Sequence, residues 1–223
     1  ADWILADAKP VAASPPTTPS TKNIINAAGL DDTGVKGGVS PAILRAEVML
    51  DRVHNSPGVI DGRDGENFKH ALRSFRSAHH LKEGGLDRKV WDDLIAESGG
   101  PVLTDVTLND ADVEGPFYPD LPKDYAELAK LKTIGYRNVS QKLGAKFHMG
   151  EELLAALNPG VDLSKAGTKI LVADVDAPAV KGKVAKVIVD KSSAQVLGFD
   201  RKSHILVSYP ATIGSRELPS PSG

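Results

Sequence analysis

The sequence contains no cysteine among its 223 residues. Disulfide bonds, thiolate metal sites and a cysteine nucleophile are therefore excluded within this chain. The sequence also lacks any run of about 20 apolar residues, the length that spans a bilayer, so we expect no membrane span. Lysine and arginine (27) nearly balance aspartate and glutamate (29), for a net charge of -2. This balance argues against a nucleic-acid partner, which normally requires a basic protein surface.

A signal peptide is also missing from the start of the sequence, which is typical of a cytoplasmic, a processed or a trimmed chain. Hydrophobic residues make up 41% of the sequence and charged residues 25%, as in ordinary soluble globular proteins. The length allows one large domain or two to three small ones.

Residues 1–39 are predicted to form a tether followed by a loop. Residues 8–22 are rich in proline, alanine, serine and threonine, a composition typical of an extended, solvated linker. Residues 23–39 contain four glycines and almost no periodic apolar pattern, so we interpret them as a loop.

Residues 40–97 carry the pattern of three short amphipathic helices. Ser40 and Pro41 form a typical start signal, with serine as the N-cap and proline at the first helical position. Asp87 is placed to cap the third helix. The apolar positions at helical spacing are Ile43, Ala46, Leu50 and Val53 in the first helix and Phe68, Ala71, Leu72 and Phe75 in the second. Together they predict a small bundle with Phe75 and Trp91 in its core.

The rest of the chain changes from a helical to a β pattern. Helices are predicted at 125–131, 139–147 and 151–157, and strands at 170–172, 184–189, 194–199 and 205–209. The last three strands would form a meander with unpaired edges, so we expect residues 181–223 to begin a domain rather than to complete one. The predicted fold class is α+β, with several domains.

The helical region contains a recognisable order of motifs. They are the run Ser56-Pro57-Gly58-Val59-Ile60-Asp61-Gly62, then Asn67-Phe68, Ala71-Leu72 and Phe75, then Gly85-Leu86-Asp87 and Trp91. This order resembles the three-helix peptidoglycan-binding domain of bacterial cell-wall enzymes. Arg76 and Asp64 depart from the family, which often has glutamine and an aromatic residue at these positions. The resemblance implies that residues 40–97 are such a domain.

A second set of motifs lies in residues 136–173, within the predicted unit 98–180. They are Leu153-Leu154, Leu157-Asn158-Pro159-Gly160 and Gly167-Thr168 before Ile170. They resemble a LysM-type module, a small βααβ unit that binds N-acetylglucosamine chains. Its opening segment would be Tyr136–Val139, which lacks the usual Gly-Asp-Thr-Leu.

The segment Val184–Gly223 carries the third resemblance, in VIVDKSSAQVLGF and VSYPATIGSRELPSPSG. Both runs are similar to the first strands of an L,D-transpeptidase catalytic domain. That family's active site has a His-Gly pair and a Ser-x-Gly-Cys-x-Arg motif, neither of which is present here. The resemblance therefore implies a parent cysteine-dependent acyl transferase whose catalytic residues lie outside this chain, and no catalytic residue is predicted within it.

Five residues are candidates for contacting a ligand. Asp61, Arg63, Asn67 and Arg76 are polar residues at or near the turns of the bundle, where short loops could bind carboxylates and amides. Asn158 is first of all a helix stop and only secondly a sugar contact. The adjacent His79 and His80 point about 100° apart on a helix and do not predict a metal site. No metal, cofactor or serine–histidine–aspartate triad is predicted.

Together these observations predict the peptidoglycan-binding portion of a cell-wall L,D-transpeptidase. Its partners would be the stem peptides and glycan strands of peptidoglycan, and its location the periplasm or the extracellular cell envelope, after signal-peptide removal. A non-catalytic peptidoglycan-binding or anchoring protein remains an alternative. A lytic enzyme or amidase is a weaker one, because it would need a metal-ligand set or acidic dyad.

Overall fold

A computed structural model describes residues 20–34, 38–122, 124–131, 134–214 and 220–221. They form a mixed α+β structure with two small antiparallel sheets. The helices are α1 Thr21–Ala27, α2 Pro41–Arg52, α3 Glu66–Ala78, α4 Arg88–Ser98, α5 Asp110–Val113, α6 Tyr125–Leu128, α7 Val139–Lys146 and α8 Glu151–Leu157. The strands are β1 Leu103–Thr107, β2 Lys169–Ala173, β3 Lys186–Asp190, β4 Gln195–Phe199 and β5 Ile205–Pro210.

The three predicted helices of the bundle are present as α2, α3 and α4. The Ser40 side chain accepts a hydrogen bond from the Ile43 amide at the start of α2, and Asp87 accepts one from the Val90 amide at the start of α4. Phe75 is fully buried and Trp91 is 2% exposed, so the prediction that both belong to the core is confirmed.

The prediction that residues 23–39 form a loop is wrong over residues 23–27, which belong to helix α1 together with the last two residues of the predicted tether. Ser20 caps this helix, and Ile25 is buried. The Asn26 amide side chain accepts hydrogen bonds from the Val102 and Leu103 amides, both at 2.8 Å. Contacts with distant residues therefore stabilise a helix too short to be evident from its own pattern. Residues 1–19 of the predicted tether lie outside the described part of the chain.

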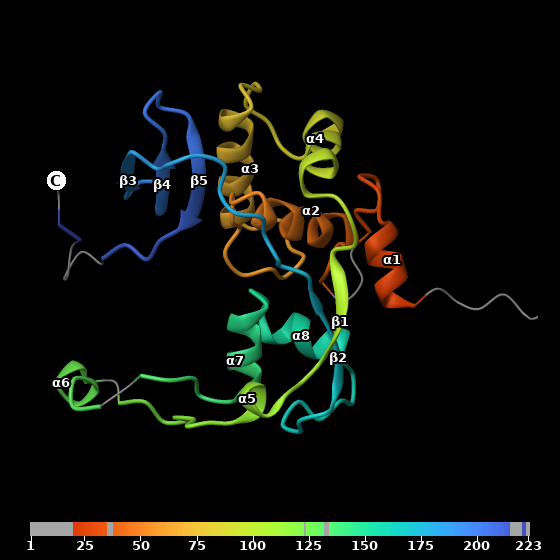
Figure 1. The fold of residues 1–223 in the computed structure, drawn as a ribbon, viewed down its shortest axis with the longest axis vertical. Helices are drawn as coiled ribbons and strands as arrows, with labels where there is room; N and C mark the ends of the chain where they lie inside the picture. The colour runs from red at the N-terminus through yellow and green to blue at the C-terminus, as the bar shows by residue number, and fades with distance from the viewer. Residues whose placement is uncertain (1–19, 35–37, 123, 132–133, 215–219, 222–223) are drawn as a thin grey trace, which may run out of the picture.

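The small sheet of β1 and β2 joins segments far apart in the sequence. Leu103 pairs with Ala173 and Thr107 pairs with Lys169 in an antiparallel register. Helices α7 and α8 lie between these strands in the chain and beside them in space (Figure 1). The prediction that Tyr136–Val139 opens the βααβ unit is wrong: Asn138 caps α7, and the first strand is β1. The residues between β1 and α7 include the short helices α5 and α6.

The strands β3, β4 and β5 form the predicted meander, and their antiparallel pairing in this order is confirmed. The sheet packs on α3 through buried polar side chains, because Ser208 Oγ donates to Ser74 Oγ at 2.9 Å and Ser74 Oγ donates to Gln195 Oε1 at 3.3 Å. Two further bonds join the backbone of β5 to the segment that follows α2. Ser56 N donates to Ser208 O and Ser208 N donates to His54 O, both at 2.8 Å.

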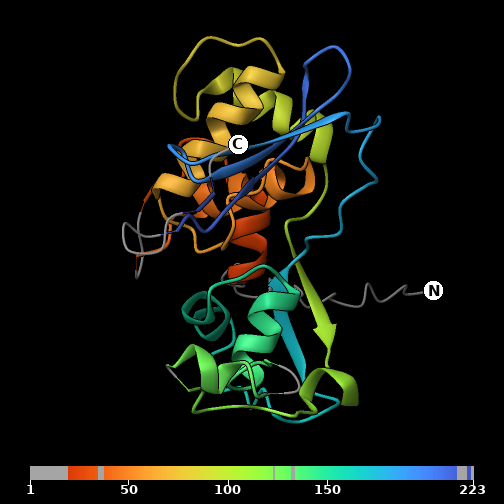
Figure 2. The same cartoon turned by 90° about the vertical axis from the view of Figure 1, so that its left-hand side faces the viewer.

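Two halves make up the structure, and Figure 2 shows the bundle with β3–β5 above α5–α8. The strands β1 and β2 run between them. The hydrophobic core is nevertheless continuous, since Leu50 and Phe75 of the bundle belong to the same buried cluster as Leu154 and Ile170 of the lower half. Within the described ranges, no helix has the length and apolar character needed to cross a bilayer.

Candidate functional site

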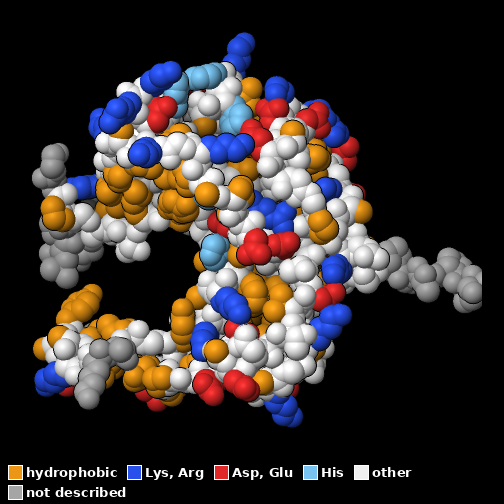
Figure 3. All heavy atoms as spheres, in the orientation of Figure 1, with side chains coloured by type: hydrophobic (Ala, Val, Ile, Leu, Met, Phe, Trp, Pro, Cys, Tyr) orange, Lys and Arg blue, Asp and Glu red, His pale blue; other side chains and the backbone are white. Residues whose placement is uncertain are grey.

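A cleft opens where the bundle, the α7–α8 turn and the end of β5 meet. It has a volume of about 620 Å³ and is bounded by the end of α2, residues 56–59, α7, residues 148–151 and residues 209–210. Figure 3 shows the wide hollow to which it belongs, open to solvent on the left, with hydrophobic side chains along its upper and lower walls.

A short backbone bridge fixes the geometry of this cleft. The Ile60 amide donates to the His148 carbonyl oxygen at 2.8 Å, and the Gly150 amide donates to the Ile60 carbonyl oxygen at 2.9 Å. A Cβ atom at Gly144 would lie 2.8 Å from the Met149 carbonyl oxygen, so only glycine lets the turn approach α7 this closely. The motif Ser56–Gly62 is thereby attached directly to the α7–α8 turn.

The same motif is held on its other side by a buried carboxylate. Glu47 of α2 is 2% exposed, and its Oε2 atom accepts hydrogen bonds from the Gly62 amide at 2.7 Å and the Asp61 amide at 3.1 Å. Burial raises the pKa of Glu47 well above its ordinary value, because a charged carboxylate loses its hydration there. Glu47 thus orders the loop that carries two of the predicted ligand residues.

A second buried carboxylate, Asp51, lies one helical turn further along α2 and faces the cleft. Its Oδ2 atom is 2.7 Å from His148 Nδ1, and its Oδ1 atom accepts a hydrogen bond from Ser56 Oγ at 2.6 Å. The hydrogen bond with Asp51 raises the pKa of His148. The three side chains are not a hydrolase triad, because Ser56 donates to the carboxylate and not to the imidazole.

Tyr209 of β5 completes the polar side of the cleft. Its pKa is raised by partial burial and by the nearby charge of Asp51. Its hydroxyl lies 3.4 Å from His54 Nδ1, and the other ring nitrogen of His54 is 2.8 Å from the Pro178 carbonyl oxygen. The cleft therefore combines an oriented imidazole and a phenol with apolar walls.

Three of the predicted ligand residues lie together at a neighbouring, smaller cavity. Asp61, Arg63 and Asn67 line a hollow of about 260 Å³ beside Glu47. Asp61 accepts a hydrogen bond from the Arg63 amide at 2.9 Å, and the exposed guanidinium of Arg63 pairs with Glu152 at 2.8 Å. The structure therefore brings these three candidates onto one rim.

The other two predicted residues, Arg76 and Asn158, use their polar groups within the protein. Arg76 is 7% exposed, and its guanidinium donates to the carbonyl oxygens of Lys82 and Gly85 and to Asp87. Asn158 is also 7% exposed, and its side chain makes three hydrogen bonds to the backbone of Leu154 and Leu171. Their polar groups are already satisfied within the protein.

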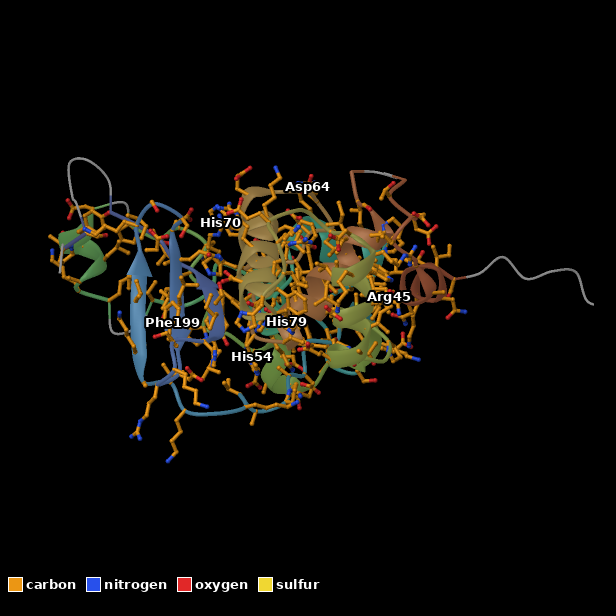
Figure 4. The ribbon with its side chains drawn as sticks, turned by 90° about the horizontal axis from the view of Figure 1, so that it is seen from above. Arg45, His54, Asp64, His70, His79 and Phe199 are labelled. Carbon is orange, nitrogen blue, oxygen red and sulfur yellow. The ribbon has the colours of Figure 1, made fainter. Side chains whose placement is uncertain are left out.

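Outside the cleft, the ring of His79 has local hydrogen-bond partners. His79 Nδ1 lies 2.8 Å from the Phe75 carbonyl oxygen, and its Nε2 lies 2.5 Å from Glu97 Oε1. Figure 4 shows His54 near His79, with Asp64 on the opposite side of the bundle. In the described part of the chain, no three histidine, aspartate or glutamate side chains group as metal ligands.

Sequence reasoning missed the cleft residues Asp51, His148 and Tyr209. One signal was available in α2, where Leu44, Glu47, Val48 and Asp51 recur at helical spacing and place two carboxylates on the apolar stripe. His148 carries no comparable signal, because it lies 97 residues from its partner.

Comparison of the sequence with protein-family models and with curated proteins finds no match. The resemblances to wall-binding modules and to L,D-transpeptidases therefore depend on the motif residues named above.

Proposed function

We propose that this chain is the peptidoglycan-binding portion of a cell-wall L,D-transpeptidase. The observation that carries the proposal is the rim formed by Asp61, Arg63 and Asn67, between the motif loop Ser56–Gly62 and the first turn of α3. Glu47 and the backbone bridge hold this loop in place, so its side chains are positioned before a ligand arrives. An exposed arginine beside amide and carboxylate groups suits the carboxylates and amides of a stem peptide.

At the level of domains, we assign residues 40–97 to the peptidoglycan-binding bundle and 98–180 to a linker with a LysM-like module. In this assignment the module is β1, α7, α8 and β2, with residues 108–138 inserted after its first strand. Residues 181–223 would be the first strands of the catalytic domain. The antiparallel pairing of β1 with β2, with α7 and α8 before β2 in the chain, supports the assignment of a βααβ unit.

In the parent enzyme, a cysteine thiolate would attack the stem peptide, release its terminal D-residue and pass the acyl group to an amine. This chain has no cysteine, so its own contribution would be binding, at the cell envelope. The same absence favours a second candidate, a non-catalytic anchoring protein. The two candidates share the binding function and differ in whether a parent enzyme carries the cysteine motif.

A pull-down with purified sacculi tests the binding function. We expect the whole chain to be retained weakly and reversibly, and the double variant Arg63→Ala/Asn67→Ala to be retained several-fold less, since both side chains lie on the rim. Lys165→Ala is a matched control, because Lys165 is exposed and its ammonium pairs, among the residues that the structure describes, with Asp162 alone. Equal retention of the double variant and the control would refute binding through the rim. No retention of any of the three proteins would refute peptidoglycan binding.

A further inference from the structure

We propose that an apolar groove on the bundle is the docking site of this chain's own N-terminal segment, with Trp3, Ile4 and Leu5 as the docked side chains. The groove lies between the α1–α2 connection, α3 and the loop 83–86, and it has a volume of about 540 Å³. It is a different cavity from the rim, with which it shares only the lining residue Phe68. The inference does not depend on the proposed function.

The floor of the groove is apolar and partly uncovered. Phe68 and Leu72 of α3 are 4% and 3% exposed, whereas Leu30, Ile43 and Leu86 remain half-buried at the edge of the core. Apolar surface of this kind is stabilised when another apolar group removes it from water. The apolar lining residues are Leu30, Ala42, Ile43, Phe68, Leu72 and Leu86.

Both walls of the groove are held by hydrogen bonds within the fold. On one side the Arg76 guanidinium donates to the Gly85 carbonyl oxygen at 2.8 Å, which fixes the loop 83–86. On the other side the Gly29 amide donates to Asp32 Oδ2 at 2.6 Å, and the Ala42 amide donates to the Asp32 carbonyl oxygen at 3.2 Å. The groove is therefore preformed, and docking has to order only the incoming peptide.

The N-terminal segment contains a motif that suits this floor. Trp3, Ile4 and Leu5 stand together in a stretch whose only other large apolar residue before Ser20 is Val11. A solvated tether of proline, alanine, serine and threonine gains nothing from three large apolar side chains in water. Such a cluster is typical of a short recognition motif that packs into an apolar groove.

The charges at the mouth of the groove complement those of the motif. Arg73 of α3 is exposed, and its guanidinium has no ion-pair partner in the described part of the chain. Lys69, by contrast, already pairs with Glu66 at 3.1 Å. Asp2 and Asp7 flank the apolar motif, so either carboxylate can pair with Arg73. The charged residues that line the groove are Asp64, Lys69, Arg73 and Glu83, and Figure 4 labels Asp64.

The tether is long enough for the motif to reach the groove of the same molecule. Leu5 lies 15 positions before Ser20, the N-cap of α1. At about 3.1 Å per residue, a proline-rich segment of this length spans about 45 Å, several times the length of α1. A flexible connection of this kind raises the effective concentration of the motif at the groove. Docking within one chain would close the tether into a loop, and release would extend it.

Fluorescence quenching of the full chain tests the docking. The sequence has two tryptophans, and Trp91 is 2% exposed, so quenching by acrylamide reports mainly on Trp3. The variant Trp3→Phe gives the contribution of Trp91, which is subtracted. We expect a quenching constant for Trp3 several-fold lower than in a synthetic peptide of residues 1–19. It should be the same at about 1 and 100 µM protein, because the contact is intramolecular.

Two variants of the groove should release the motif. Gly85→Leu adds a side chain to the lining, where a Cβ atom meets nothing within 4 Å and the backbone is not left-handed. Arg73→Glu reverses the charge at the mouth. In each variant we expect the quenching constant of Trp3 to rise several-fold, towards that of the peptide. Arg201→Glu is the matched control, because Arg201 is exposed in the turn between β4 and β5, and thermal melts check that every variant folds.

Three results would overturn the inference. One is quenching of Trp3 in the wild type equal to that in the free peptide. Another is protection of Trp3 that stays unchanged in both folded groove variants. The third is protection that increases with protein concentration, which would assign the groove to the motif of a second copy. The sacculus pull-down is independent of all three, because it tests the rim.

Discussion

At the scale of single residues, two buried carboxylates of α2 organise the region around the cleft. Glu47 accepts hydrogen bonds from two consecutive backbone amides of the motif loop, and Asp51 joins Ser56 to His148. Both lie on the face of α2 that otherwise carries apolar residues into the core. A buried polar group costs free energy unless it is hydrogen-bonded, so these partners are required by the fold.

Replacing Glu47 tests how strongly the loop depends on it. Glu47→Ala leaves the Asp61 and Gly62 amides without their acceptor, and we expect a loss of about 2–4 kcal/mol in the free energy of unfolding. Glu47→Gln keeps an oxygen acceptor and should lose less. Urea unfolding measures both, and equal losses would show that the hydrogen bonds contribute little.

The pH dependence of this comparison follows from the raised pKa of Glu47. The folded state holds the Glu47 proton more tightly than the unfolded state. The stabilisation of the folded state by this proton is therefore fully present below the ordinary pKa of 4.5 and is lost as the pH rises through the folded pKa. Glu47→Gln has no such proton. The stability of the wild type relative to Glu47→Gln should therefore fall as the pH rises above 4.5.

A separate measurement concerns the Asp51–His148 pair. Asp51→Asn removes the carboxylate that raises the pKa of His148, so we expect this pKa to fall in the variant. NMR titration of the histidine ring protons measures it, with His80 as an internal reference. An unchanged His148 titration would mean that the pair does not persist in solution.

At the scale of elements, α8 and β2 are joined by a single side chain. Asn158, at the C-terminal end of α8, donates to the Leu154 and Leu171 carbonyl oxygens at 2.8 Å and accepts from the Leu171 amide at 2.7 Å. The motif Leu157–Gly160 thus has a structural role in this chain: it ends α8 and connects it to the sheet.

Removing this connection should destabilise the lower half of the molecule. Asn158→Ala leaves buried backbone groups unpaired, and we expect a loss of about 2–4 kcal/mol in the free energy of unfolding. Asn67→Ala serves as the matched control, since Asn67 is exposed. Chemical denaturation compares the two, and similar stabilities would contradict the structural role of Asn158.

At the scale of the whole molecule, the bundle and the β1–β2 unit share one core. Arg52, at the end of α2, is 6% exposed and donates to the carbonyl oxygens of Asp174, Gly99 and Pro101, at 2.6, 3.0 and 2.7 Å. It also pairs with the Asp174 carboxylate at 3.0 Å. These bonds fix to the bundle the end of the small sheet at which β1 begins and β2 ends, so we expect the two parts to unfold together.

Phe75→Ala tests this cooperativity. The fully buried ring leaves a cavity in the bundle, and we expect a loss of about 3–5 kcal/mol. If the core is one unit, hydrogen exchange at the Ile170 and Leu171 amides of β2 should accelerate by the same factor as exchange in α3. Faster exchange in α3 alone would show that residues 40–97 are an independent domain.

The sequence by itself determined the local features of this protein. Ser40, Pro41 and Asp87 mark helix starts, the apolar spacing selects Phe75 and Trp91 as core, and alternation with turns predicts the β3–β5 meander. Such signals depend on residues three or four positions apart, so they can be identified from a single sequence. The ligand candidates of the rim could be predicted in the same way, because they lie in or shortly after one short sequence motif.

Only the tertiary structure decided the pairing of β1 with β2, the packing of α1 and the meeting of Asp51 with His148. These contacts join residues 62 to 97 positions apart, and no local spacing specifies them. Closing such long loops costs conformational entropy, which is offset when many buried contacts form at once. The cleft exists because the whole core assembles, and its residues could not be identified one segment at a time.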